Sequence, residues 1–454
     1  MSGTFLDKDV PPTLISFAIA PIKAGDVISP EFKEAGHPVY LFAPVDETPA
    51  STKAAWEAFH ALCKAGKVKA AWAVENGIAE AVMKMSFGNE IGFKANDAVN
   101  HWYGAMMQDF IVAELCEEVT SEYATKIGET TIAPEIDLGS EKATVAELVA
   151  INEGVLEGVY PTAAPAKSAL ETFSYTGGCT AAPAVKCARP KVLIPVFPGT
   201  NCEYDSARAM ERAGAEADIV VIRNLTADDV ARSVETVSKK LAESQMVFIP
   251  GGFSGGDEPD GSAKFITAFF RNPEIKEQVG KLLDARDGLM LGICNGFQAL
   301  IKLGLVPYGK IIDTDENCPT LTYNIIGRHQ SKLVRTRVCT NKSPWLAGTE
   351  VGQIYTVPIS HGEGRFLCSD ELALQLAKNG QVATQYVDLA GNPTMDTAFN
   401  PNGSVFAIEG ITSPDGRVLG KMGHSERVGK DLYKNVLGEY DMQLFASAVK
   451  YFKK

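Results

Sequence analysis

Short apolar runs alternate with amphipathic stretches between residues 191 and 303. The apolar runs, each followed by a turn and a sequence with helical spacing, are Val192–Phe197, Asp218–Ile222, Met246–Pro250 and Gly288–Ile293. Short buried strands that alternate with helices are typical of a parallel sheet covered on both faces. The pattern therefore predicts an α/β fold with a doubly wound, mostly parallel sheet in this half of the chain.

Turn and cap residues mark where these elements meet. Thr226 is followed by Asp228 and Asp229, which is a favourable start for a helix that runs to about Ser244. Glycine-rich turns, Pro250–Phe253 and Gly292–Gly296, follow two of the expected strands. Ligands bind at the carboxyl ends of the strands in such sheets, so we expect a functional site at these turns.

The remainder of this half has a different pattern. Residues 308–402 are less regular and are expected to be rich in strands. A hairpin is predicted over 405–422, with its turn at Ser413-Pro-Asp-Gly416, and the last helix is expected at about 441–451.

The first part of the chain reads as a separate mixed α/β domain. Its expected strands are Thr13–Pro21, Val39–Pro44 and Asp109–Leu115, and it contains no catalytic constellation. Residues 161–190 are rich in Ala, Thr, Gly and Pro and lack apolar periodicity, which predicts a linker. We therefore expect domains at 1–160 and 191–454, joined by 161–190.

Composition excludes several classes of protein. A length of 454 residues suggests two or three domains, and 45% hydrophobic with 22% charged residues indicates an ordinary folded protein. The net charge of −13 argues against a nucleic-acid-binding face. No secretory signal or membrane-spanning run is visible. The nine cysteines form no Cys-x-x-Cys pair, which favours reduced thiols in a cytoplasmic protein.

Cys294 is the strongest candidate for a catalytic residue. The sequence Gly292-Ile-Cys294-Asn-Gly296 lies between a buried strand and a helix, as a nucleophile does at a sharp strand-to-helix turn. Small residues on both sides allow the chain and a substrate to approach, and the helix N-terminus favours a thiolate. A structural cysteine buried at a strand end is the alternative.

A thiolate nucleophile needs an imidazole for proton transfer and a group that orients the imidazole. Of the six histidines, His361 and His424 both occur as His-x-Glu, with Glu363 and Glu426. Residues two apart in an extended segment project to the same side, so either carboxylate could orient its own histidine. Spacing alone leaves both histidines open.

Five motifs in order resemble a known family. They are Phe197-Pro-Gly-Thr-Asn201-Cys202, Pro250-Gly-Gly-Phe-Ser-Gly-Gly-Asp257, Gly292-Ile-Cys-Asn-Gly-Phe-Gln298, Ser360-His-Gly-Glu-Gly-Arg365 and His424-Ser-Glu-Arg427. Together they resemble the glutaminase domain of phosphoribosylformylglycinamidine synthase, a flavodoxin-like class I glutamine amidotransferase of purine biosynthesis. The resemblance extends from about Lys191 to the C-terminus.

The resemblance implies roles for individual residues. It implies a catalytic triad of Cys294, His424 and Glu426, and gives His361 a role in shaping the site or an interface. It also implies that glutamine and its oxyanion are bound by Gly252, Phe253, Asn295 and Gln298. No metal is implied. A phosphate-binding loop at 251–256 is disfavoured because no Gly-Lys-Ser/Thr follows.

The resemblance also implies a larger enzyme. Glutamine hydrolysis needs no cofactor, whereas the full-length synthase uses ATP and magnesium to convert formylglycinamide ribonucleotide to formylglycinamidine ribonucleotide. Residues 1–160 resemble the last domain of the synthetase region, and the chain is expected to be a fragment of the large single-chain type. The expected partners are glutamine and the N-terminal synthetase region, with no nucleic acid and no membrane. The alternatives are a catalytically silent docking module and another Cys-His-Glu hydrolase.

Overall fold

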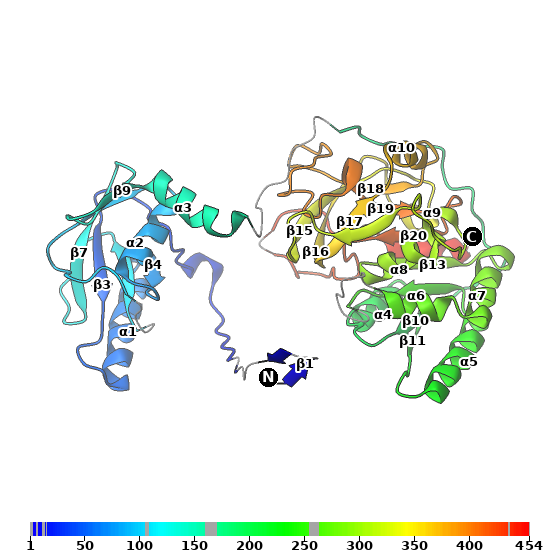
Figure 1. Ribbon diagram of the computed structural model, residues 1–454, viewed down its shortest axis with the longest axis horizontal. Helices are drawn as coiled ribbons and strands as arrows, with labels where there is room; N and C mark the ends of the chain where they lie inside the picture. The colour runs from blue at the N-terminus through cyan, green and yellow to red at the C-terminus, as the bar shows by residue number, and fades with distance from the viewer. Residues whose placement is uncertain are drawn as a thin grey trace. The chain divides into compact units, whose positions relative to one another are not determined.

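The computed structural model describes residues 3–5, 8–10, 14, 16–104, 109–158, 170–253, 263–434 and 436–453. The chain divides into two units, Met1–Leu156 and Glu157–Lys454 (Figure 1). Among the described residues, no helix combines the length and the apolar character needed to cross a membrane.

The second unit is built on a nine-stranded sheet. In spatial order its strands are β11 (Glu216–Val221), β10 (Lys191–Val196), β12 (Met246–Ile249), β13 (Leu289–Ile293), β20 (Val418–Lys421), β19 (Ile408–Thr412), β18 (Val382–Tyr386), β15 (Gln330–Val338) and β16 (Ile354–His361). The first five strands are parallel, and the other four extend the sheet with antiparallel pairings. A separate antiparallel pair is formed by β14 (Thr320–Tyr323) and β17 (Glu363–Leu367).

Helices cover both faces of the parallel part. Every residue of β12 and β13 is buried, and successive side chains of a strand point to opposite faces, so neither face is open to solvent. Among the described residues of this unit, the α-helices are α4 (Glu203–Arg212), α5 (Ala227–Glu243), α6 (Lys264–Phe270), α7 (Pro273–Gly280), α8 (Asn295–Leu303), α9 (Leu305–Tyr308), α10 (Asp370–Lys378) and α11 (Leu444–Lys453). The predicted α/β class with a doubly wound sheet is confirmed.

Local signals in the sequence correspond to observed boundaries. The Thr226 hydroxyl accepts a hydrogen bond from the Asp229 N–H, which caps α5 as expected. β19 and β20 form the predicted hairpin, and the turn between them is closed by the Gly416 N–H donating to the Ser413 carbonyl. The strand-rich character expected for 308–402 is also observed.

The first unit has a seven-stranded, largely antiparallel sheet. Its order is β4 (Val68–Ala73), β6 (Ile111–Leu115), β3 (Pro38–Phe42), β7 (Ala124–Thr131), β5 (Gly92–Ala95), β8 (Glu135–Asp137) and β9 (Lys142–Thr144). Its helices are α1 (Pro49–Lys64), α2 (Ile78–Phe87) and α3 (Val145–Glu157), and a short hairpin pairs β1 (Gly3–Phe5) with β2 (Lys8–Val10). Val39 packs in the core with α2, whereas Tyr40 packs with residues of α1, so these helices cover opposite faces.

One predicted strand is wrong. The described residues of Thr13–Pro21, which are 14 and 16–21, have no strand pairing, and Leu14, Phe17 and Ile19 are exposed. Their apolar pattern suggested burial, but a strand also needs a neighbour for its backbone N–H and C=O groups. The expected strands at 39–44 and 109–115 are present as β3 and β6.

Residues 170–190 contain no helix or strand but pack against the second unit. The buried Phe173 N–H donates to Gln385 Oε1, and the Tyr175 N–H donates to the Cys339 carbonyl. The Cys187 N–H donates to the Phe452 carbonyl in α11. This part of the expected linker is therefore tied to the core of the second unit.

Candidate active site

The candidate site lies at the carboxyl ends of four neighbouring parallel strands. Cys202 follows β10, Gly251 follows β12, Cys294 follows β13 and His424 follows β20. These residues are far apart in sequence, but parallel strands bring their ends to one edge of the sheet. The predicted place for the functional site is therefore where the candidate residues lie.

Cys294 occupies a strained turn between β13 and α8. Its backbone has φ 53° and ψ −108°, a conformation that non-glycine residues seldom adopt. A Cβ atom at Gly292 would lie 2.6 Å from the backbone of Gly296, and one at Gly296 would lie 2.0 Å from the Ile249 carbonyl oxygen. The two glycines are therefore required by close approach of the chain, for the reason that the Gly-x-Cys-x-Gly pattern indicated.

The first turn of α8 begins directly after this cysteine. The Gln298 N–H donates to the Cys294 carbonyl, and the Cys294 N–H donates to the Lys421 carbonyl at the end of β20. The thiol is buried, and its Sγ lies 3.8 Å from the Ser360 carbonyl oxygen. Cys294 is the N-cap residue of α8, and a helix N-terminus stabilises negative charge that develops beside it.

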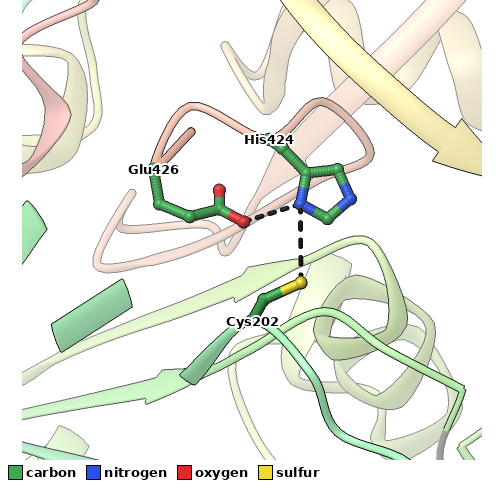
Figure 2. Close-up of side chains that lie close together, drawn as sticks. All are labelled: Cys202, His424 and Glu426. Atoms are coloured by element: carbon green, nitrogen blue, oxygen red, sulfur yellow. Dashed lines mark hydrogen bonds and ion pairs between the residues drawn. The ribbon is translucent and has the colours of Figure 1, made fainter. Parts of the chain in front are cut away.

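His424 and Glu426 form a buried pair beside this turn. His424 Nδ1 lies 2.6 Å from Glu426 Oε1, a contact that Figure 2 marks with a dashed line, and the His424 backbone N–H donates to the Pro358 carbonyl. Burial acts to lower the pKa of His424, but the Glu426 charge and hydrogen bonds with Cys202, Cys294 and Glu426 outweigh it and raise this pKa well above its usual value. The protonated form of the His424 imidazole is therefore favoured.

Gly251 lies between this histidine and the cysteine. A Cβ atom built on Gly251 would lie 2.7 Å from His424 Cε1 and 3.4 Å from Cys294 Cβ. The His424 and Cys294 side chains therefore border the same small space beside Gly251. Any side chain larger than that of glycine would fill this space. The structure brings together Cys294, His424 and Glu426, the three residues of the expected triad.

His361 has different surroundings. It lies at the end of β16, and its Nδ1 is 3.1 Å from Asn324 Oδ1, an amide rather than a carboxylate. Burial, and then the charges of His424 and His329, lower the pKa of His361 to about 3. A histidine with this pKa is neutral at physiological pH, so it does not keep a proton taken from a thiol.

The expected glutamine-binding residues are only partly available for that purpose. Gln298 Nε2 donates to the Glu363 carbonyl, and Gln298 Oε1 accepts from Asn295 Nδ2, so this amide links α8 to the first residue of β17. The Phe253 N–H donates to the Gly199 carbonyl. Gly252 has φ +143°, and a Cβ there would lie 2.5 Å from the Gly199 oxygen. Ser254–Asp257 of the same motif lies outside the described residues.

Sequence reasoning missed Cys202 as a member of the site. Its Sγ lies 3.9 Å from His424 Nδ1 and 3.0 Å from Arg427 Nη2 (Figure 2 shows the first contact). The motif Phe197–Cys202 contained the signal, but nothing in its spacing pointed to His424. Ligand atoms of Cys202, His424 and Glu426 lie within 4.8 Å of one another, as in a metal site. The Arg427 guanidinium on the same sulfur already places a positive charge there, which opposes a metal ion.

A buried ion pair supports the segment that carries His424. Lys421 Nζ lies 3.2 Å from Glu409 Oε1 and donates to the Gly423 carbonyl. The same carboxylate accepts from the Gly423 N–H at 2.6 Å and from the Thr384 hydroxyl. Both charged side chains are buried, and an uncompensated buried charge is costly. The pair therefore fixes the backbone between the end of β20 and His424.

Comparison with known proteins gives matches to the second unit. Residues 189–452 match the family model of the CobB/CobQ-like glutamine amidotransferase domain. The phosphoribosylformylglycinamidine synthase subunit PurQ of Methanococcus maripaludis strain C7 is 34% identical over 287 residues, which cover 58% of this chain and 98% of the relative. PurQ of Aquifex aeolicus is 33% identical over 252 residues, covering 55% of this chain and 95% of the relative.

A solved structure also matches. A chain of PurLQS from Thermotoga maritima is 28% identical, with a TM-score of 0.42, and the match covers 58% of this chain and 100% of that one. The family and sequence matches confirm the resemblance expected from the five motifs.

Proposed function

This chain belongs to the CobB/CobQ-like glutamine amidotransferase family, and we propose that Cys294 is the nucleophile with which it releases ammonia from glutamine. His424 acts as the acid and base, and Glu426 orients it. This assignment rests on one observation. The strained Cys294 turn and the His424–Glu426 pair both border the space beside Gly251. In the alternative base, His361, Nδ1 faces the amide oxygen of Asn324 and not a carboxylate.

The first half of the reaction forms a thioester. Because Nδ1 of His424 faces Glu426, Nε2 is the nitrogen that serves Cys294. The raised pKa of His424 favours a thiolate and an imidazolium in the resting site. The Cys294 sulfur attacks the side-chain amide carbon of glutamine, and His424 gives its proton to the amide nitrogen. The C–N bond breaks, ammonia leaves, and a glutamyl thioester remains on Cys294.

The second half hydrolyses the thioester. Neutral His424 accepts a proton from water as the water oxygen attacks the thioester carbon. The C–S bond then breaks, which releases glutamate and restores the thiolate and imidazolium. Backbone N–H groups of Gly252 and Asn295 are the proposed donors to the oxyanion in both halves, and each such donor is worth about 10²–10³ in rate. Gln298 supports this geometry by fixing the start of α8 against the Glu363 carbonyl.

The relatives support a place for this activity in purine biosynthesis. They are named as the PurQ subunit of phosphoribosylformylglycinamidine synthase. We infer that the ammonia is used, with ATP and magnesium, by a synthetase region that is the partner of this glutaminase. Residues 1–160 are proposed to be the last domain of that region, which would make the chain part of the single-chain type.

Active-site labelling tests this proposal. A diazoketone analogue of glutamine should label Cys294 and abolish glutamate release, and Cys294→Ser should take no label. The eight other cysteines serve as internal controls in the same mass spectrum. A label on another cysteine, or glutamate release by the Cys294→Ser chain at the unmodified rate, contradicts the assignment. A chain that neither takes label nor releases glutamate would be the silent docking module instead.

A further inference from the structure

The Cys202 thiol lies beside the proposed acid–base residue but is not used by the mechanism above. It is the residue before α4, where a side chain commonly caps the helix, yet it makes no capping hydrogen bond. Its sulfur instead points toward His424, and only 1% of the residue is exposed. Figure 2 shows this sulfur below the same ring nitrogen that faces Glu426.

The sulfur is held in place from two sides. Arg427 Nη2 donates to it at 3.0 Å, and a guanidinium can only donate, so the sulfur accepts. The thiol is also 3.0 Å from Asn201 Oδ1, an acceptor that the S–H can reach. Arg427 Nε lies 3.5 Å from Asp205 Oδ2 in the first turn of α4. Cys202 thereby connects the α4 N-terminus to the loop that carries His424.

The position of Cys202 restricts the histidine ring. Glu426 and Cys202 both lie against the Nδ1 edge, at 2.6 and 3.9 Å. Gly251, after the neighbouring strand β12, leaves room for the His424 ring. A Cβ atom on Gly251 would lie 2.7 Å from His424 Cε1 and 3.1 Å from the Cys202 sulfur. Removal of the sulfur would open a space into which the ring could tilt, away from Cys294.

We propose that Cys202 is a positioning residue of the glutaminase, whose sulfur, held by Arg427, keeps Nε2 of His424 directed at Cys294. This inference rests on the proposed function. Cys202 lies on the Nδ1 side of His424, so it holds the acid–base residue rather than the substrate. Its effect therefore falls on turnover and not on glutamine binding.

The charge around the ring gives a second consequence. The groups that face His424 are Glu426, Cys202, Cys294, His361 and Tyr433, with Arg427 behind the sulfur. Cys202 acts with Glu426 and Cys294 to raise the pKa of His424. Loss of the sulfur should lower this pKa, so the alkaline limb of the kcat/KM profile, where the imidazolium loses its proton, should move to lower pH.

The experiment compares Cys202→Ala, Cys202→Ser and Cys339→Ala with the wild-type chain. Cys339 is a matched control because it is another buried thiol with polar contacts, to Gln385 Oε1 and the Arg337 carbonyl, outside the site. Glutamate release gives kcat and KM across pH, thermal unfolding gives Tm, and the diazoketone gives the rate of labelling at Cys294.

For Cys202→Ala we expect kcat to fall about 10- to 100-fold, as a misplacement of roughly 1 Å costs in other enzymes, with KM changed less than about twofold. Cys202→Ser should recover part of kcat, and Cys339→Ala should lower Tm but not kcat. An unchanged kcat and pH profile in Cys202→Ala overturns the inference, and so does a rise in KM alone, which would place Cys202 in glutamine binding. A wild-type chain that neither releases glutamate nor takes label overturns the proposed function and this inference with it.

Discussion

Gly251→Ala tests whether His424 and Cys294 must share the space beside β12. The φ of Gly251 is not in the left-handed region, so the backbone itself accepts alanine. The new methyl group would lie 2.7 Å from His424 Cε1, 3.1 Å from the Cys202 sulfur and 3.4 Å from Cys294 Cβ. The substitution therefore perturbs the site through side chains and not through backbone strain.

The size of the effect follows from these distances. Non-bonded carbon atoms pack best at about 3.5–4.0 Å, so the histidine ring must move away by roughly 1 Å. The ring is buried and held at 2.6 Å by Glu426, so this movement misdirects Nε2. We expect kcat to fall by about 10²-fold or more. Overpacking of this kind should lower the free energy of unfolding by about 1–3 kcal/mol.

Glutamate release and chemical denaturation measure the two effects separately. Gly280→Ala, at the end of α7, is the control, because among the described residues a Cβ there meets no atom within 4 Å beyond its chain neighbours and its own helix backbone, and the backbone is helical. It should leave kcat unchanged and raise stability by up to about 1 kcal/mol. A folded Gly251→Ala chain with wild-type kcat would refute the argument, because it would mean that the His424 ring is not needed where the structure places it.

Three further outcomes are expected. His424→Ala should lower the glutaminase rate by a factor of about 10²–10⁴, whereas His361→Ala should leave a measurable rate. Loss of activity in His361→Ala alone would reverse the two roles. Gly296→Ala should fail to fold or show a much lower Tm, because its Cβ would lie 2.0 Å from the Ile249 carbonyl oxygen in the backbone of β12; a wild-type Tm would contradict the tight turn. The pKa of His361 is lowered to about 3 in the fold, so its contribution to the free energy of unfolding is complete above pH 6.5 and is lost as pH falls toward 3, by about 1.4 kcal/mol per pH unit. Between pH 7 and pH 5, the free energy of unfolding should therefore fall by about 2 kcal/mol less in His361→Gln than in wild type.

Much of the second unit could be predicted because its signals are local. Gly292 before Cys294, the cap at Thr226 and the turn at 413–416 act on residues within a few positions of themselves. Their consequences do not depend on the rest of the fold. The strand-and-helix alternation worked for the same reason, since burial on both faces of a parallel strand leaves an unbroken apolar run in the sequence.

Contacts between residues at the ends of different strands could not be predicted from such local signals. His361 and His424 have the same spacing to a glutamate, and only the tertiary structure pairs one with Glu426 and the other with Asn324. Cys202 meets His424 across 222 positions because β10, β12, β13 and β20 are neighbours in the sheet, an order that local patterns do not encode. The exposed segment before Pro21 shows the converse, because an apolar pattern forms a strand only where another strand lies beside it. The sequence by itself thus determined which residues have suitable chemistry, and the order of strands in the sheet decided which of them meet.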